Sequence, residues 1–531
     1  MARGRGRGSR LGRRPRRPGH RRARPRPRGA AARPPRGLSA PRGGRVSHVR
    51  LRSRRRRAGG HLGAAPHSGS LRGCLAVTDG RELPAAPDPV RWVIRKLEQA
   101  GFETWAVGGV VRDALAGRRA DADWDLATRA RPEQVRAVFR RVVPIGLEHG
   151  TVGVLTRGEM YEVTTFRRDV ETFGRRATVE FADDIDEDLA RRDFTINAIA
   201  WHPLRREMRD PFGGAHDLAA GILRTVGDAR TRFAEDFLRI LRALRFAGRF
   251  ALAVEPETWS ALCEHRQHLA DLSPERVREE LTKTLGSAHP SRALSLYAAS
   301  GVLPFLYPEL ARCLNRSEDS RLDSWSAALQ MVDIVSRRYP LARLACLLGA
   351  IGVPSGGVGE ELPPEERAGM RAAALMERLR YSRADTEGVS ALLRAVATGP
   401  EIGTGPALRR WLHQTREVDR RHLFRIWIAR ARLGTALGAR DPERAVLSCW
   451  RAVRAELAMD PPLALADLAL SGRDLIEMGM RPGPGFGAVL AHLLDLVLDD
   501  PALNRGSILA LRARRYVDAR ARAARTSERP R

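Results

Sequence analysis

The spacing of apolar residues divides the chain into a mixed region and a helical region that meet near residue 216. In the mixed region, Val90–Ala100 and Val110–Ala116 have the spacing of amphipathic helices, and Thr104–Val107 has that of a short strand. Thr151–Thr156 and Met160–Phe166 alternate apolar and polar residues and predict a β-hairpin. Beyond residue 216, segments rich in Ala, Leu and Arg have helical spacing almost to the end. The pattern predicts an α+β chain with a small mixed head and a long helical remainder.

Composition and charge mark a third region at the N-terminus. Residues 1–60 are mostly Arg, Gly and Pro, and residues 1–78 hold 24 arginines and no acidic residue, so the net charge of +31 mainly describes this segment. A segment this poor in apolar residues buries too little surface to offset its ordering entropy, which predicts disorder. Three interpretations stay open: a dispensable or wrongly translated extension, a nonspecific RNA-binding tail, and an organelle transit peptide.

Cysteine usage and hydropathy bear on the compartment. The 5 cysteines are scattered without a C-x-x-C pair, which disfavours a disulfide scaffold or a Cys-ligated zinc site and fits a reducing cytoplasm. No uninterrupted apolar run approaches the roughly 18 residues that a membrane helix needs. We therefore expect a soluble, cytoplasmic protein.

Two carboxylates, Asp123 and Asp125, stand two positions apart in a short extended segment. On a strand, residues i and i+2 point to the same face, so the two side chains converge. Such oxygen ligands can hold Mg²⁺ together with substrate phosphates, and a pair of ions would activate an attacking hydroxyl and neutralise a leaving pyrophosphate. The same spacing is common on solvated strand faces, so the pair alone leaves both interpretations open.

Paired glycines, Gly108 and Gly109, stand between the predicted strand and the predicted helix that carries Arg112. Glycines let the backbone approach a phosphate closely, and the start of a helix presents free N–H groups to it. Arg112 adds a forked donor for phosphate oxygens. The position of this turn shortly before Asp123 favours a phosphate site over a simple tight turn.

A predicted helix after Glu235 repeats a polar residue at every third position. Its polar stripe consists of Asp236, Arg239, Arg242 and Arg245. One interpretation is a surface helix stabilised by ion pairs of about 0.2–0.5 kcal/mol each. The other is that Asp236 and Arg239 present an acceptor and donors to the edge of a nucleobase. Helix geometry alone leaves both interpretations open.

Six segments that occur in order connect these features to a family. They are GGVVRD, DADWDLAT, RRDFTINAIAW, DPFGGAHDL with LRTVGD, RFAEDFLRILRALRFAGRF and LSPERVREELTKTL. Together they resemble the class II tRNA nucleotidyltransferases, which are the CCA-adding enzymes, and their relatives the bacterial poly(A) polymerases. The resemblance is dense over about residues 88–290 and continues more weakly to about residue 510. It implies a DNA-polymerase-beta-type nucleotidyltransferase head with a small mixed sheet, followed by an all-helical neck, body and tail.

The resemblance also implies a division into five regions. They are a disordered Arg/Gly/Pro-rich tail at 1–80, a catalytic head at 85–225, a helical neck with the nucleotide-selecting motif at 226–290, a helical body at 291–450 and a helical tRNA-binding tail at 451–531. In the body, Gly349 and Ala350 stand where many bacterial relatives have the His and Asp of an HD phosphohydrolase. Without those donors no divalent metal site forms there, so we predict no phosphohydrolase activity.

The family's functional residues map onto the quoted motifs. Asp123 and Asp125 match its metal-binding carboxylates, which implies Mg²⁺ as the cofactor. Glu162 in the hairpin is either a third carboxylate or general base, or a solvent-facing strand residue. The positions that match nucleotide contacts are Gly108 at the turn, Gly109 and Arg112 at the triphosphate, Arg192 of RRDFT, the base-recognising Asp236 and Arg239, and the pocket-lining Arg242 and Arg245.

The resemblance implies an enzyme that completes tRNA 3′ ends with CCA from CTP and ATP, without a nucleic-acid template and with release of pyrophosphate. Its partners are then tRNA, CTP and ATP, with no membrane and no stable protein partner inferred. A-adding, CC-adding and poly(A)-adding enzymes share the motifs and remain alternatives. Residues 167–177, interpreted as a flexible loop, favour full CCA addition over CC addition. A noncatalytic RNA-binding protein or chaperone is the alternative from another class.

Overall fold

The computed structural model describes residues 83–527 apart from residue 84 and residues 119–123, 148–149, 174–175, 315–323, 353–360, 400–401 and 437–441. The Arg-rich tail at 1–80 and Asp123 therefore lie outside the described residues. Every helix in the described ranges is too short or too polar to cross a membrane.

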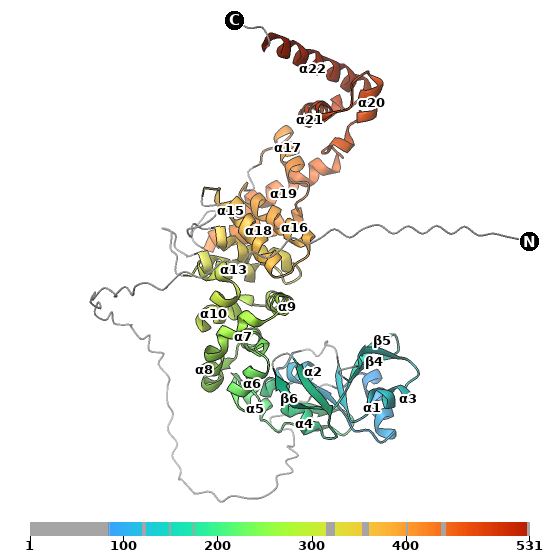
Figure 1. Ribbon diagram of the computed structural model, residues 1–531, viewed down its shortest axis with the longest axis vertical. Helices are drawn as coiled ribbons and strands as arrows, with labels where there is room; N and C mark the ends of the chain where they lie inside the picture. Colours follow the sequence, from blue (N-terminus) through green and yellow to red (C-terminus); the bar gives the residue numbers. More distant parts are fainter. Residues whose placement is uncertain are drawn as a thin grey trace, which may run out of the picture. The chain divides into compact units, whose positions relative to one another are not determined.

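The head is built on a seven-stranded mixed sheet with the strand order β3-β4-β5-β2-β1-β8-β9. Figure 1 labels β4 and β5 of this sheet. Its strands are β1 Thr104–Val107, β2 Asp125–Thr128, β3 Val142–Gly146, β4 Thr151–Thr156, β5 Glu159–Thr165, β8 Ala200–His202 and β9 Glu207–Arg209. Only β2 and β5 run parallel, and the other neighbours are antiparallel. The predicted strand at Thr104–Val107 and the predicted hairpin, which is β4 and β5, are confirmed.

Helices cover the head sheet because their apolar residues recur along one side. In α1 (Asp88–Gln99), Val90, Val93, Ile94 and Leu97 are buried at helical spacing. They share a core with Trp124 just before β2, with Leu126 of β2, and with Val152 and Val163 of β4 and β5. The other head helices are α2 Gly109–Leu115, α3 Pro132–Val138, α4 Ile185–Ala190 and α5 Gly214–Ala220.

The prediction that residues 167–177 form a loop is wrong, because most of them lie in two paired strands. Their role in full CCA addition stays a prediction. Strands β6 (Arg167–Phe173) and β7 (Arg176–Phe181) pair antiparallel, with Arg167 opposite Phe181. Both segments are rich in Val, Thr and Phe, which favour strands, and pairing satisfies backbone groups that a loop would leave to water. The helical region also contains one small exception, because Ile222–Leu223 (β10) pairs in parallel with Ala253–Val254 (β11).

The rest of the described chain is helical apart from that short pairing, as the apolar spacing predicts. After the head come α6 Ala229–Glu235, α7 Leu238–Phe250, α8 Pro256–His265, α9 Pro274–Leu285 and α10 Pro290–Ser300. Next are α11 Leu303–Leu306, α12 Pro308–Ala311, α13 Ser324–Ile334, α14 Pro340–Leu348, α15 Pro364–Arg378, α16 Arg383–Val396, α17 Pro406–Gln414, α18 Arg420–Ala436 and α19 Pro442–Ala458. The last helices are α20 Gly472–Glu477, α21 Pro484–Asp499 and α22 Gly506–Ser527.

Two hydrophobic cores organise the helical region. One contains buried residues from α6 through α19, and the other joins α20, α21 and α22. Gly349 and Ala350 lie in a 3₁₀ turn, Gly349–Gly352, and Ala350 is buried in the first core. Gly349 and Ala350 therefore offer no metal-binding side chain, and Ala350 packs among apolar residues.

Candidate active site

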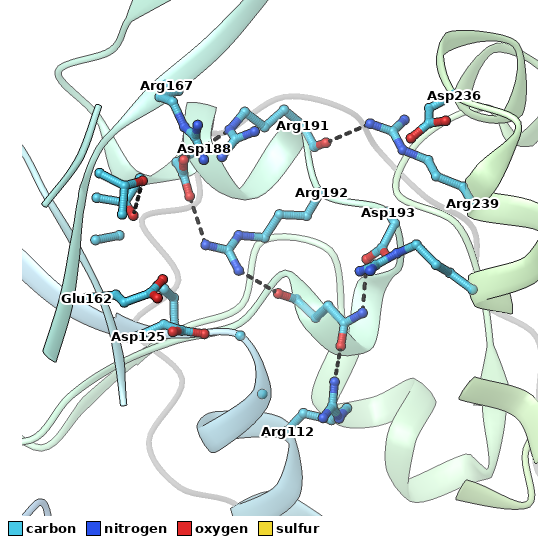
Figure 2. A pocket seen from close by; sticks show the side chains of 18 of the residues that line it. Arg112, Asp125, Glu162, Arg167, Asp188, Arg191, Arg192, Asp193, Asp236 and Arg239 are labelled. Carbon is cyan, nitrogen blue, oxygen red and sulfur yellow. Dashed lines mark hydrogen bonds and ion pairs between the residues drawn. The ribbon is translucent and has the colours of Figure 1, made fainter. Parts of the chain in front are cut away.

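A cavity of about 550 Å³ lies where the head meets α7 and α9 (Figure 2). We call it the head–neck cavity. Its volume is in the range of pockets that bind small ligands. Residues from the β1–α2 turn, β2, β5, the segment after α4 and the neck helices line the cavity. The charged and amide residues among them are Arg112, Asp125, Glu162, Arg167, Asp188, Arg191, Arg192, Asp193, Asn197, Asp236, Arg239, Arg242 and Arg276.

The glycine turn lies directly against two other motifs. Gly108 has φ +73, which glycine adopts without strain, and a Cβ placed there would lie 3.3 Å from Arg192 Nη1 and 3.7 Å from Asp125 Oδ2. Asp125 stands opposite Val107 in the β1–β2 ladder. Gly109, the first residue of α2, also lines the cavity. Three motifs that are distant in the sequence therefore meet at one point.

Asp125 and Glu162 form a pair of carboxylates on adjacent strands. Leu126 is opposite Val163 in the parallel β2–β5 ladder, so Asp125 and Glu162 are neighbours on the same face. Both line the head–neck cavity, and Figure 2 shows them together on one side of it. Carboxylate oxygens are the ligands that hard divalent cations prefer, so this donor set fits such an ion.

The described residues alone do not make a complete metal site. Within the described ranges, no group of three or more His, Cys, Asp or Glu side chains lies close enough together to hold a metal ion. Asp125 and Glu162 supply two carboxylates, and Asp123, the other half of the D-x-D pair, lies outside those ranges. A third carboxylate would have to come from outside the described residues.

Arg192 lies between the carboxylates and the neck. Its Nη2 donates to Asp188 Oδ2 at 3.0 Å and its Nη1 to the Asn197 carbonyl at 3.3 Å. Asp188 also accepts from Arg191 Nε at 3.0 Å. Although burial opposes ionisation, these two arginines hold the pKa of Asp188 below its usual range. A charged, buried Asp188 therefore fixes the Arg192 guanidinium at the cavity.

Arg112 lines the cavity, but its guanidinium is occupied by protein groups. It is only 5% exposed and donates to Asp113 Oδ1 at 2.8 and 2.7 Å and to Asn197 Oδ1 at 2.6 Å. Its guanidinium carbon also lies 4.6 Å from the centre of the Phe250 ring on α7. Burial lowers the pKa of Arg112 and Asp113 opposes that effect. In this structure Arg112 connects the head to α7.

The same connection continues through Asn197 and Asp193. Asn197 Nδ2 donates to Asp193 Oδ1 at 2.9 Å, and Arg242 donates to Asp193 Oδ2 from Nε at 2.7 Å and from Nη2 at 2.6 Å. Burial opposes ionisation of Asp193, but Arg242 and Asn197 hold its pKa below the usual range. Arg112, Asn197, Asp193 and Arg242 thus form a continuous polar chain from the head to the neck.

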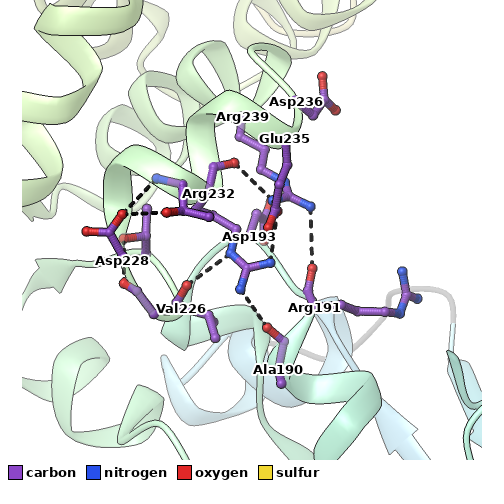
Figure 3. Close-up of polar contacts among 12 residues, drawn as sticks. Ala190, Arg191, Asp193, Val226, Asp228, Arg232, Glu235, Asp236 and Arg239 are labelled. Carbon is purple, nitrogen blue, oxygen red and sulfur yellow. Dashed lines mark hydrogen bonds and ion pairs between the residues drawn. The ribbon is translucent and has the colours of Figure 1, made fainter. Parts of the chain in front are cut away.

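Asp236 and Arg239 both line the cavity and are held by different partners. Asp236 ends α6 and accepts from Leu238 N at 3.1 Å and from Arg276 Nη2 at 2.7 Å. Arg239 pairs with Glu235 and donates to the carbonyls of Arg232 at 3.0 Å and Arg191 at 3.4 Å (Figure 3). An acceptor and a donor group are therefore fixed on the neck side of the cavity.

Arg245 is placed differently from the other residues of its stripe. It is 7% exposed, donates to Glu280 Oε2 of α9 at 2.6 Å, and is not among the residues that line the head–neck cavity. Its guanidinium carbon lies 4.3 Å from the centre of the Phe246 ring. The nucleotide contact predicted for Arg245 stays a prediction, and its contacts here join α7 to α9.

Several cavity residues were not assigned a role by the sequence analysis: Arg167, Asp188, Arg191 and Arg276. The i,i+4 spacing of Asp188 and Arg192 is a signal that predicts their ion pair. Nothing in the sequence pattern brings Arg276 of α9 to Asp236, because that contact depends on how α9 packs against α7.

Comparison with known proteins identifies two family regions in the chain. Residues 104–224 match the poly A polymerase head domain, and residues 251–314 match the probable RNA and SrmB-binding site of polymerase A. The first match covers the strands of the head sheet, and the second covers helices α8 to α12.

Similar proteins extend over most of the chain. It is 34% identical to a CCA-adding enzyme of Geobacillus stearothermophilus over 74% of this chain and 88% of the relative. It is 32% identical to one of Levilactobacillus brevis over 77% of this chain and 93% of the relative. The crystal structure of the Bacillus stearothermophilus CCA-adding enzyme in complex with CTP matches with a TM-score of 0.64 and 30% identity, over 82% of this chain and 100% of that one. From its motifs, its fold and these relatives, we conclude that the chain belongs to the CCA-adding enzyme family of nucleotidyltransferases.

Proposed function

We propose that this enzyme completes tRNA 3′ ends by adding C, C and A from CTP and ATP without a nucleic-acid template. The observation that carries the proposal is the arrangement of charged groups in the head–neck cavity. The carboxylates of Asp125 and Glu162 lie on one side, Asp236 and Arg239 on the other, and the Arg192 guanidinium between them (Figure 2). The relative crystallised with CTP supports a cytidine nucleotide as one substrate. Because the scattered cysteines fit a reducing compartment, we propose that the enzyme acts in the cytoplasm.

The reaction transfers a nucleotidyl group. The 3′-hydroxyl of the RNA attacks the α-phosphate of CTP or ATP, the new P–O bond forms, and the bond to the leaving pyrophosphate breaks. We infer that Asp123, Asp125 and Glu162 hold Mg²⁺, which when bound would lower the pKa of the attacking hydroxyl and neutralise the developing charge. Glu162 belongs to this set because it is the strand neighbour of Asp125.

The remaining cavity residues bind and orient the nucleotide. Gly108 lets the backbone approach the phosphates, and Arg192, fixed by Asp188, presents its guanidinium to their oxygens. The Asp236 carboxylate accepts a hydrogen bond from the base and the Arg239 guanidinium donates to it. Both groups can do so because protein contacts hold them on the neck side of the cavity. Arg112 joins the head to α7, Arg242 fixes Asp193, and Arg245 joins α7 to α9. Direct nucleotide contacts of these three arginines stay predictions.

The test uses the full chain with Mg²⁺ and three tRNA transcripts that end before CCA, after C and after CC. Each transcript is offered labelled CTP, labelled ATP, or both. The proposal expects all three to be extended to one CCA end. Extension of only the CC-ended transcript with ATP would instead identify an A-adding enzyme, and unlimited addition of A would identify a poly(A) polymerase.

A further inference from the structure

The outer face of β3, β4 and β5 exposes a group of apolar side chains. Val143, Ile145, Leu155 and Met160 are between 37% and 51% exposed. A Cβ placed on Gly153 would lie 2.8 Å from Met160 Sδ and 2.9 Å from Ile145 Cδ1, so these two side chains cover the Gly153 backbone. We call these four residues the apolar platform. Exposed apolar patches of this kind commonly mark binding surfaces.

The apolar platform is continuous with the carboxylate pair. In the β4–β5 ladder, Gly153 is opposite Glu162 and Leu155 is opposite Met160. Met160 and Glu162 are exposed on one face of β5, whereas Tyr161 between them is buried in the head core. Positions two apart on a strand are about 7 Å apart, so the platform begins one side chain away from Glu162.

The platform also lies on the side from which the RNA must arrive. Figure 2 shows Asp125 and Glu162 on one side of the cavity and Asp236 and Arg239 on the other, with Arg192 between them. A nucleotide bound between these two sides places its α-phosphate near the carboxylates. In nucleotidyl transfer the attacking and leaving oxygens are roughly in line, so the attacking hydroxyl must approach from beyond the carboxylates. The strands β4 and β5 lie there.

The border of the platform fits phosphate groups. Arg141 precedes β3, and its carbonyl accepts from Leu155 N at 3.0 Å. Arg157 lies in the β4–β5 turn with φ 50. Both are exposed, as is Arg140. Apolar side chains bordered by arginines suit the end of a single RNA strand, because base faces are apolar and its backbone is anionic.

We propose that the apolar platform binds the bases of the last unpaired nucleotides of the RNA primer and directs its 3′-hydroxyl at Asp125 and Glu162. The inference rests on the proposed function and specifies how that site holds its second substrate. Contact through base faces tolerates any base, which suits a primer whose last base changes with each addition.

The test compares Met160→Ser with Met370→Ser, a matched change of an exposed methionine in α15. Steady-state extension of a C-ended tRNA by CTP gives the KM for tRNA, and calorimetry without tRNA gives the Kd for CTP. We expect the KM for tRNA to rise about tenfold in Met160→Ser, because the apolar contact between the Met160 side chain and a base is lost. The Kd for CTP should not change, and Met370→Ser should match the wild type. Ile145→Ser provides a second platform variant.

A primer whose last two nucleotides lack bases tests the contact itself. With this primer, the wild type and Met160→Ser should have equal KM values, because the base contact is missing in both. A KM for normal tRNA that stays at the wild-type value in Met160→Ser and Ile145→Ser overturns the inference. Light scattering that shows a dimer lost in these variants, with KM unchanged, would assign the platform to a second copy of the chain. If the wild type extends none of the three transcripts, the proposed function itself fails.

Discussion

At the scale of single residues, each charged side chain of the cavity is held in position by the partner that it contacts. Asp125 has Glu162 as its strand neighbour, Asp236 accepts from Arg276, and Arg192 donates to a buried Asp188. The sequence identifies the first member of each pair through a motif. In the pairs formed by Asp125 and Asp236, the second member comes from another strand or helix. Its role therefore follows only from the tertiary contact.

Replacement of Asp125 by Asn should remove nucleotide incorporation and leave tRNA binding intact. The amide keeps the size of the side chain but removes the negative charge that attracts a divalent cation. We expect kcat to fall by at least about 10³-fold, since metal ions contribute several kcal/mol to such transition states. Single-turnover incorporation and filter binding of tRNA measure the two properties separately. Incorporation at the wild-type rate would show that Asp125 holds no essential metal.

Replacement of Arg276 by Ala should weaken base selection. Arg276 donates to Asp236 at 2.7 Å, and without it the carboxylate keeps only its bond from Leu238 N and is held less firmly toward the base. We expect discrimination of CTP and ATP against UTP and GTP, measured as the ratio of kcat/KM values, to fall about tenfold, because a well-placed bidentate pair contributes about 1–3 kcal/mol. Arg278→Ala on the same helix is the control, because Arg278 is outside the cavity lining. Equal losses in both variants would indicate general damage to α9.

At the scale of elements, the polar chain from Arg112 to Arg242 joins α2 of the head to α7 of the neck. Its members come from α2, from the segment after α4 and from α7. Buried charges in such a chain are stable only when each finds its partner, so breaking one contact leaves an unpaired group in the interior. The chain therefore fixes the helix that carries Arg239 relative to the turn that carries Gly108.

Replacement of Asp193 by Asn should destabilise the protein at neutral pH by about 2 kcal/mol, because it keeps an acceptor oxygen but removes the negative charge that pairs with the partly exposed Arg242. The pKa of Asp193 is lowered in the folded state, so its stabilising effect is present above the unfolded pKa and is lost as the pH falls through the folded one. The difference between wild type and variant in the free energy of unfolding should therefore shrink below about pH 4. Urea denaturation of both proteins at several pH values measures this difference in the free energy of unfolding.

Asp88→Asn serves as the control for this measurement. Asp88 is exposed at the start of α1, and its contact with Arg91 is 3.9 Å. Exposed ion pairs contribute little, so this variant should unfold like the wild type at every pH. A pH-independent difference between wild type and Asp193→Asn would contradict the argument that the charge of Asp193 is what stabilises the contact.

At the scale of the whole molecule, most of the net positive charge lies in the N-terminal segment, whereas the candidate catalytic and nucleotide-binding residues are concentrated in the head–neck cavity. Residues 1–78 contain 24 arginines, and every residue that lines the cavity lies between 107 and 276. The two properties are therefore separable in one chain. The three interpretations of the N-terminal segment lead to different results when it is removed.

Removal of residues 1–78 should leave kcat for CCA addition unchanged and reduce nonspecific RNA binding. Arginines that neutralise phosphates release counterions, so the shortened chain should show a smaller slope of log affinity against log salt. Fluorescence anisotropy with a non-tRNA RNA at several salt concentrations measures the slope. An unchanged slope would exclude the RNA-binding interpretation, and a lost kcat would exclude that of a dispensable extension.

The sequence by itself determined the family and the elements whose apolar spacing is regular. The spacing of Val90, Val93, Ile94 and Leu97 predicts α1 because a helix buries one face, and alternation predicts β4 and β5 for the same reason in a strand. These patterns are local, so they can be recognised in the sequence without knowledge of the fold. The six motifs are equally local, so family membership could be inferred before any contact was known.

The tertiary structure alone decided how those residues are used. It buried Arg112 and Arg245 among protein partners, placed Glu162 beside Asp125, and brought Arg276 to Asp236. It also paired residues 167–173 with 176–181 where a loop had been expected. Each of these facts depends on contacts between distant segments, and neither spacing along the chain nor residue type specifies which segments meet.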